Sequence, residues 1–292
     1  MKTLCFVLPG KALLPEVQAY REYFSSNYQV FVRHDTADVA QFDIVWFFMG
    51  LPFYRARREQ FIVHEFTSLS TPPYARLKDN IKRYLLPKPS LRVFQNEVQA
   101  SILGFNDGAP QLFRDMGVSA NFMQPGGDRK SIDLVYAGSM ARSRQLDRAL
   151  DKIVLLKPDI RLDLYGIPES HLQRRYAAYS GIAFRGPVDY NDIPRLLRKA
   201  QFGLNYVPDC YPYNLQTSTK LLEYAACGLP VIGNRTAWVD RFLQQQPLCY
   251  FDLQTLSSWP GNSTLAPLPE LPQHWLWQQR IASAGFETIL PK

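Results

Sequence analysis

One segment in the second half of the chain combines anion-binding residue types with the signals of a helix start. Residues 214–234 read NLQTSTKLLEYAACGLPVIGN. Three neighbouring residues are good helix N-cap types: Thr217, Ser218 and Thr219. The free N–H groups of a helix start, with Lys220 beside them, form a site for an anion such as phosphate. Glu223 lies about one turn further along this helix.

Two purely structural roles are alternatives to a ligand contact for Glu223: a capping box and an ion pair. A capping-box glutamate needs Ser or Thr three residues earlier, and the residue at that position is Lys220. An ion pair between Lys220 and Glu223 on the helix surface fits the i,i+3 spacing. The spacing alone therefore does not decide between an ion pair and a ligand contact.

The elements that must position this segment alternate along the chain as short apolar runs and helical stretches. The first half predicts strands at residues 4–8, 28–32, 43–49, 61–66 and 91–94. After a Pro-Gly-Gly loop signal, further strands follow at 132–137, 161–165, 182–185, 202–207 and 230–233. This alternation is typical of parallel α/β sheets. It predicts two Rossmann-like domains, with ligands beyond the carboxyl ends of the strands and in the cleft between the domains.

The expected domain division follows from these signals. We predict an N-terminal Rossmann-like domain over residues 1–127 and a C-terminal Rossmann-like domain over residues 128–272. The stretch 257–272 is rich in Pro, Ser and Gly and reads as a loop. An amphipathic helix over residues 273–290 should then pack back on the first domain.

Composition narrows the class of protein. The 292 residues carry a net charge of +7, which favours anionic partners without choosing among them. No Cys-x-x-Cys pair and no apolar run of membrane-span length occurs, so we expect a cytoplasmic protein, peripheral to the inner face of the membrane at most. A dinucleotide Gly-x-Gly-x-x-Gly fingerprint is absent. Since Asp-x-Asp is also absent, we expect neither a cofactor nor a metal.

The 214–234 segment resembles the signature of family-4 glycosyltransferases, Lys-x-x-Glu-Tyr-x-Ala-x-Gly-x-Pro-Val-Ile after a Ser/Thr-rich turn. In that family the glutamate matching Glu223 binds the donor ribose, and the turn and helix start before it meet the diphosphate and the donor sugar. Many members carry a second glutamate eight positions earlier, where this chain has Leu215.

Weaker resemblances follow the same order along the chain. Gly138, after the strand at 132–137, matches the glycine turn that opens the donor domain. Arg142 and Arg144 lie near the positions of the family's diphosphate clamp; a solvated helix start is the alternative. Phe184 and Arg185 match the strand end beside the nucleobase, where a plain core strand explains them equally well.

In the first domain, the run Phe-Ile-Val-His-Glu-Phe brings two ionisable residues together near a strand end. His64 resembles the family's histidine near the donor sugar, whereas a lone histidine in such a place is often structural. Glu65 should point to the opposite face of the strand.

The resemblance implies a GT-B transferase that moves a sugar, with retention, from a nucleoside-diphosphate sugar to a glycan or lipid-linked glycan, in polysaccharide biosynthesis. It also implies that the domain over residues 1–127 binds the acceptor and that the domain over residues 128–272 binds the nucleotide sugar. The donor phosphate would then take the acceptor proton. An inverting transferase with Glu65 or Asp43 as base is one alternative. A nonenzymatic nucleic-acid-binding protein is another, but the positive charge is spread over both halves instead of forming one arm. We therefore expect no nucleic-acid partner.

Residues 75–86 predict a helix that packs Leu77, Ile81, Tyr84 and Leu85 on the core. Its basic residues, Arg76, Lys82 and Arg83, would then face solvent. A sharper interpretation of this basic face is docking on anionic lipid headgroups.

Overall fold

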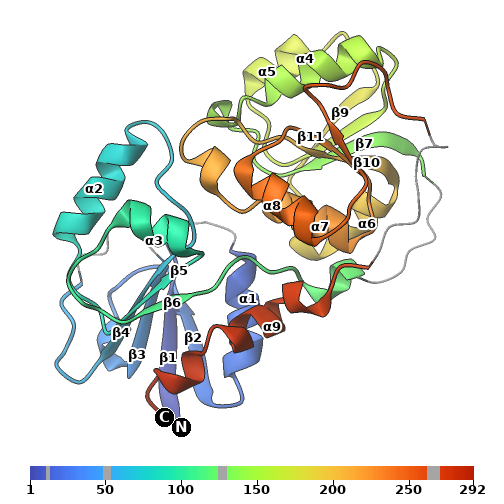
Figure 1. Ribbon diagram of the computed structural model, residues 1–292. Helices are drawn as coiled ribbons and strands as arrows, with labels where there is room; N and C mark the ends of the chain where they lie inside the picture. Colours follow the sequence, from blue (N-terminus) through green and yellow to red (C-terminus); the bar gives the residue numbers. More distant parts are fainter. Residues whose placement is uncertain (11–13, 49–53, 124–129, 262–269) are drawn as a thin grey trace. The chain divides into compact units, whose positions relative to one another are not determined.

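The computed structural model describes the chain except residues 11–13, 49–53, 124–129 and 262–269 (Figure 1). The described chain divides into two compact units, one of Met1–Gly117 with Gln273–Lys292 and one of Val118–Pro272. The expected boundary near residue 127 lies outside the described residues, and the division falls before it. The short helix η2 (Ala120–Met123) belongs to the second unit, where Phe122 is buried with its ring 5.3 Å from that of Tyr190.

The first domain contains a six-stranded parallel sheet in the order β2-β1-β3-β4-β5-β6. Its strands are β1 (Lys2–Val7), β2 (Tyr28–Arg33), β3 (Ile44–Phe48), β4 (Phe61–Phe66), β5 (Leu91–Phe94) and β6 (Gln111–Phe113). The first five match the predicted apolar runs. β6 was not predicted, because it is three residues long and pairs only along one edge, with β5.

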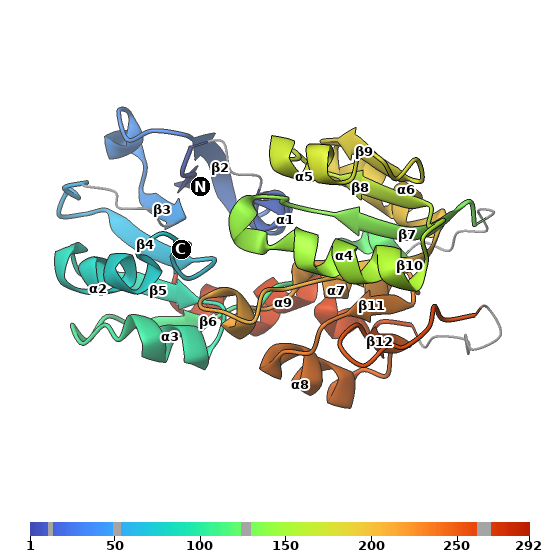
Figure 2. The ribbon, with the colours of Figure 1, turned by 90° about the horizontal axis from the view of Figure 1, so that it is seen from above.

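Helix α1 (Pro15–Phe24) covers one face of this sheet. Its Tyr20 ring lies 4.9 Å from the Trp46 ring of β3, and the Phe24 ring lies 5.8 Å from it. Helices α2 (Ala75–Leu85) and α3 (Glu97–Leu103) contact each other beside β4 and β5 (Figures 1 and 2). The aromatic residues on the α1 face form much of the core of the domain.

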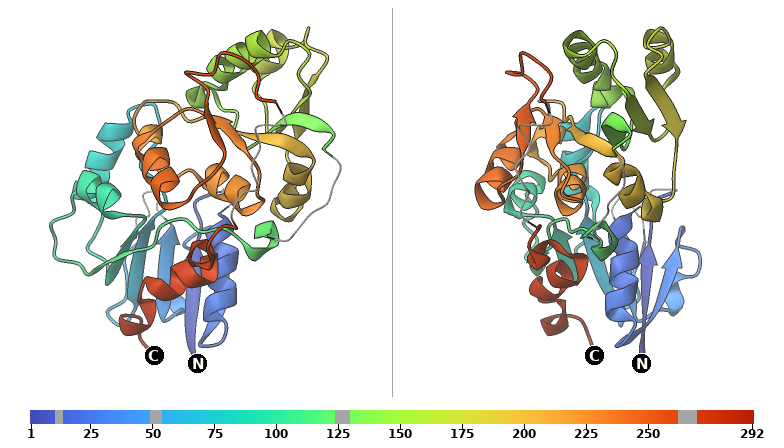
Figure 3. Two further views of the ribbon diagram at one scale, coloured as in Figure 1. Left: turned by 45° about the vertical axis from the view of Figure 1, so that its right-hand side comes forward. Right: turned by 90° about the vertical axis from the view of Figure 1, so that its right-hand side faces the viewer.

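The C-terminal segment returns to the first domain and lies along α1, as both views of Figure 3 show in red and blue. It is not the single helix that we predicted over residues 273–290. Instead it forms η7 (Gln273–Trp275), α9 (Trp277–Ser283) and η8 (Phe286–Thr288). Gly285 breaks the helix because its φ of 79° is left-handed. Phe286 then packs its ring 5.1 Å from that of Trp46.

The second domain holds the other parallel sheet, in the order β9-β8-β7-β10-β11-β12 (Figure 2). The strands are β7 (Ile132–Ala137), β8 (Leu162–Tyr165), β9 (Ile182–Gly186), β10 (Ala200–Asn205), β11 (Val231–Gly233) and β12 (Tyr250–Asp252). The helices are α4 (Leu146–Leu156), α5 (Ser170–Arg175), α6 (Ile193–Arg198), α7 (Thr219–Ala226) and α8 (Ala237–Gln245). The prediction of two Rossmann-like α/β domains is confirmed.

The strand order of the second domain defines where a ligand can bind. Counted within the domain, it is 3-2-1-4-5-6, the doubly wound order, which reverses direction between β7 and β10. In doubly wound sheets the connections leave two such strands toward opposite sides, and ligands bind beyond the carboxyl ends of these strands. The residues after Ala137 and Asn205 therefore frame the expected site.

The orientation of α2 is not the predicted one. Leu77, Tyr84 and Leu85 are exposed, while Asp79 and Lys82 of the opposite face are buried. Apolar periodicity identifies the two faces of a helix, but polar residues can be the buried ones when they are paired.

Candidate donor site

Two predicted segments meet at the switch point of the second sheet. The Gly138 turn follows β7, and the start of α7 follows β10. The Lys220 side chain reaches the turn: a Cβ built on Gly138 would lie 3.5 Å from Lys220 Cδ. Since Gly138 has a φ of 152°, a side chain there would strain the backbone, although a Cβ would make only ordinary contacts.

A second glycine brings the adjoining loops together. A Cβ at Gly166, after β8, would meet the Gly138 carbonyl oxygen at 2.2 Å, which no side chain could tolerate. The Gly138 N–H also donates to the Tyr165 carbonyl at 2.9 Å. Only glycine at 166 therefore allows the two turns to pack this closely.

Arg144 is the second cation near Lys220, and its charge lowers the lysine pKa. It lies in the short helix η3 (Arg142–Arg144), and its guanidinium carbon sits 4.4 Å from the centre of the Tyr213 ring. The Tyr213 hydroxyl donates to Ser143 Oγ at 2.9 Å, which ties the arginine loop to the segment before α7. Arg142 is exposed, and its N–H donates to Glu169 at 2.6 Å.

Ser218 caps α7 as predicted from its residue type. Its Oγ accepts from the Leu221 N–H at 3.4 Å and donates to Asn205 Oδ1, at the end of β10, at 2.6 Å. The buried cap thus fixes the helix start to the carboxyl edge of the sheet. Thr219 and Lys220 stand in the first turn, where N–H groups have no intrahelical acceptor. Thr217 is buried just before the cap.

Lys220 and Glu223 do not form the i,i+3 ion pair that their spacing allows; both are among the described residues. Lys220 Nζ lies 5.5 Å from the centre of the Tyr136 ring, and Glu223 is hydrogen-bonded to Tyr190. The pKa values of Lys220 and Glu223 are both shifted toward neutrality. Burial, with the charge of Arg144, lowers the Lys220 pKa to about 8. Burial raises the Glu223 pKa to about 7, although the Tyr190 bond and Lys220 lower it.

Phe184 and Arg185 do not join this group. Phe184 packs against the core of the second domain, and Arg185 Nε donates to Asp163 Oδ1 at 3.0 Å. Sequence reasoning instead missed three tyrosines: Tyr136, Tyr190 and Tyr213. No local motif marks them, because they reach the site from three separate elements.

A cavity of about 460 Å³ lies in the same domain beyond the carboxyl ends of β10, β11 and β12. Residues after these strands, Tyr206, Asn234 and Leu253, line it together with Arg148 and Lys152 of α4. Asn234 is itself engaged, since its amide bonds both the N–H and the carbonyl of Val207. None of the predicted donor residues lines this cavity.

His64 is the fourth residue of β4 and is buried. It lines a cavity of about 440 Å³ in the first domain with Phe47, Tyr54, Arg55 and Lys88. Its Nδ1 has no hydrogen-bond partner within the described residues. Burial, and then the charge of Arg92, lower its pKa to about 4, so the imidazole is neutral at pH 7.

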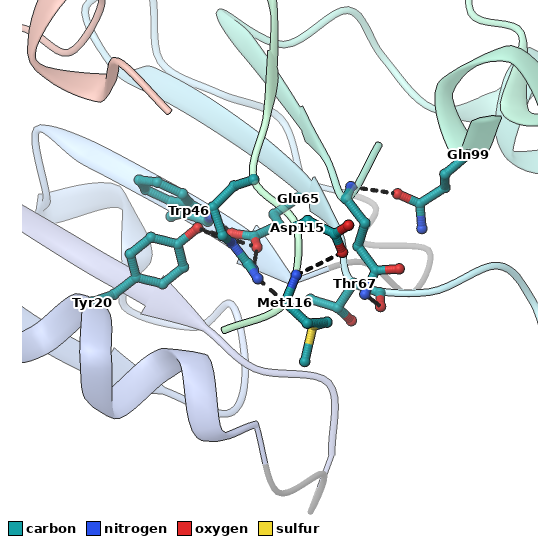
Figure 4. Close-up of polar contacts among 9 residues, drawn as sticks. Tyr20, Trp46, Glu65, Thr67, Gln99, Asp115 and Met116 are labelled. Atoms are coloured by element: carbon teal, nitrogen blue, oxygen red, sulfur yellow. Dashed lines mark hydrogen bonds and ion pairs between the residues drawn. The ribbon is translucent and has the colours of Figure 1, made fainter. Parts of the chain in front are cut away.

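Glu65 is on the opposite face and fully engaged (Figure 4). It accepts from Trp46 Nε1 at 2.8 Å and from the Tyr20 hydroxyl at 3.3 Å, and it forms a buried ion pair with Arg114. Asp43 precedes β3, at the amino edge of the sheet, and accepts from both the N–H and the hydroxyl of Thr3. Neither carboxylate therefore lies free at the carboxyl ends of the strands.

Among the described residues, no group of three or more His, Cys, Asp or Glu side chains could hold a metal ion. In that same part of the chain, no helix is long and apolar enough to cross a membrane.

Residues 142–255 match the glycosyl transferase-like family model, which begins at the arginine loop and runs past α7. No curated protein matches the chain by sequence.

Solved structures show the same fold. AviGT4, a glycosyltransferase involved in avilamycin A biosynthesis, aligns with 99% of this chain and 95% of its own, with TM-score 0.62 and 16% identity. Sucrose-phosphate synthase from Thermosynechococcus elongatus aligns with TM-score 0.65 and 12% identity, over 99% of this chain and 96% of that one. HepE of Anabaena, solved with UDP, covers 82% of each chain with TM-score 0.59 and 10% identity. The chain therefore has the GT-B fold, and its residues 142–255 match a glycosyl transferase-like family.

Proposed function

We propose that this protein is a glycosyltransferase that uses a UDP-sugar and binds it at the switch point of the second domain. The observation that carries the proposal is the convergence of Arg144, Lys220 and the first turn of α7 beside the Gly138 turn. Two solved relatives of the same fold support the choice of nucleotide: HepE was solved with UDP, and the pneumococcal O-GlcNAc transferase GtfA with UDP and GlcNAc.

Charge explains the roles of the cations. The leaving diphosphate gains negative charge as the sugar bond breaks, and preorganised donors lower that barrier. Arg144, Lys220 and the first-turn N–H groups of α7 supply positive charge at one place without a metal ion. Arg142, on the same loop but exposed, adds to the local field.

Glu223 would hold the ribose. Its carboxylate is buried yet has Tyr190 as its hydrogen-bond partner, so acceptor capacity remains for ribose hydroxyls. A buried acid with a raised pKa and no ion-pair partner is more typical of a ligand site than of a surface ion pair.

We further propose that the sugar is transferred with retention to a glycan or a lipid-linked glycan held by the first domain. In such a transfer the acceptor attacks on the face that the diphosphate leaves, and a diphosphate oxygen takes the acceptor proton. No protein base is then needed. This mechanism is supported by the engagement of Glu65 in a buried ion pair and by the position of Asp43 at the amino edge of its sheet.

A thermal-shift series with nucleoside diphosphates in EDTA tests the proposal. UDP at about a hundred times its dissociation constant should stabilise the second domain by about 2.7 kcal/mol, because it binds only the folded state. ADP and GDP serve as competitors of the same charge. Stabilisation that disappears in EDTA, or that is equal for all three, would contradict a metal-free UDP site.

UDP affinity should also depend on pH on both sides of neutrality. Below about pH 7 Glu223 gains a proton and loses acceptor capacity, and above about pH 8 Lys220 loses its positive charge. We therefore expect the tightest binding between about pH 7 and 8. The terminal phosphate of UDP also titrates near pH 6. Variants are therefore needed to assign the acid and alkaline limbs of the pH profile to Glu223 and Lys220. Glu223→Gln should flatten the acid limb, and Lys220→Arg the alkaline limb; unchanged profiles in both would refute the assignment.

His64→Ala should lower turnover more than UDP affinity, because His64 belongs to the first domain and the nucleotide residues to the second. The neutral imidazole can exchange hydrogen bonds with a sugar across the whole range of pH 6 to 8. His64→Gln, which keeps a polar group, separates this role from packing. Wild-type turnover in both variants would leave His64 a structural residue.

A further inference from the structure

Helix α2 turns its apolar residues to the outside of the first domain. Tyr74, at its N-cap, is 76% exposed, Leu77 57%, Tyr84 79% and Leu85 56%. At 100° per residue these four side chains fall on one side of the helix. Large apolar side chains rarely gather on the surface of a soluble domain without a partner.

Polar contacts hold α2 in this orientation. The buried Asp79 accepts from the Ser70 N–H at 3.0 Å and pairs with Lys82 at 3.5 Å. Arg83 donates to the carbonyls of Leu103 and Ile102 at 2.7 and 2.9 Å. Turning the helix over would break all these bonds and bury the partners unpaired, so the outward apolar face is a fixed feature of the domain.

The segment that carries this face is mostly cationic in sequence. From Thr67 to Asn96 the only acidic residue is Asp79, which is buried. Arg76 and Lys88 are exposed beside the apolar side chains, and Lys78 is half-buried. Lys88 and Arg55 also line the cavity of about 440 Å³ next to the C-terminal end of the helix. Cations thus flank the apolar face and gather at its C-terminal end, where the nearby Asp107 is already paired with Arg92.

We propose that α2 docks this protein on a lipid bilayer with anionic headgroups, with Leu77 and Leu85 at the level of the acyl chains and Lys88 among the phosphates. The combination of exposed apolar side chains with predominantly cationic flanking residues fits such a surface. Tyr74 and Tyr84 suit the headgroup region, since each has an apolar ring and a polar tip. With 11 residues, α2 lies in the interface and does not span it. The docking surface is independent of the proposed donor site.

Sedimentation with vesicles tests this inference on the full chain. Phosphatidylglycerol vesicles should retain the protein, and phosphatidylcholine vesicles should retain at least tenfold less of it. The reason is that each cation near an anionic surface contributes about 1 kcal/mol, or about a fivefold change in binding. Leu77→Asp and Lys88→Glu should each lower retention about tenfold. Leu155→Asp is the matched control, since this leucine is 82% exposed on α4 of the other domain.

UDP binding by each variant, measured in the same preparation, separates loss of docking from misfolding and from failure of the donor site. Inorganic phosphate in excess should not release the wild type, whereas high salt should. The inference is overturned if the wild type ignores phosphatidylglycerol vesicles, or if Leu77→Asp binds them as the wild type does. A Leu77-dependent dimer without vesicle binding would show instead that a second copy covers the face.

Discussion

Glu223→Gln should weaken UDP binding by about one to two decades while leaving the protein at least as stable as the wild type. Hydrogen bonds to a charged acceptor contribute roughly 1.5–3 kcal/mol, and the amide loses the charge but keeps the shape. Isothermal titration with UDP at pH 7.5 measures the affinity.

The stability part of this expectation follows from the raised pKa of Glu223. Because the folded state holds the proton up to about pH 7, ionisation of Glu223 disfavours folding, and stability from this group is lost as pH rises through that value. The glutamine removes this loss, so the melting temperature above pH 7 should stay or rise. Glu270→Gln, an exposed change in the same domain, is the control.

A surface ion pair with Lys220 would give the opposite pattern, namely unchanged UDP affinity and a slightly lowered melting temperature. That result would remove Glu223 from the donor site.

Arg114→Met should destabilise the first domain by about 3–5 kcal/mol, because it leaves the buried Glu65 carboxylate without its cation. The Tyr20 and Trp46 bonds alone cannot compensate a buried charge. Adding Glu65→Gln should recover much of the loss, since the amide is neutral and can still accept from Trp46. Urea unfolding of the three proteins measures these differences.

Arg195→Met is the control, because Arg195 pairs with Asp192 at 4.0 Å, both side chains are more than half exposed, and the loss of this pair should barely move the unfolding midpoint. Glu65→Gln alone also tests the inverting alternative. If that variant folds and binds UDP but has no turnover, Glu65 acts as a base and the retaining proposal fails.

The sequence by itself determined the two α/β domains and the capped start of helix α7. Both rest on local chemistry: apolar runs of strand length between helical stretches, and a Ser-capped helix carrying Lys220 and Glu223 on its first turns. Ser218 caps α7 as its residue type predicts, since a cap requires only neighbouring backbone groups.

Only the tertiary structure decided what pairs at long range. Strand order, which puts the turn after β7 beside α7, arises from pairings between segments distant in the chain. The same holds for Tyr190 at Glu223 and for Arg114 at Glu65, 49 residues away. Helix α2 shows the physical reason most directly. Its sequence has an apolar and a polar face, but the paired contacts of Asp79 and Arg83 with other segments decide that the polar face is buried.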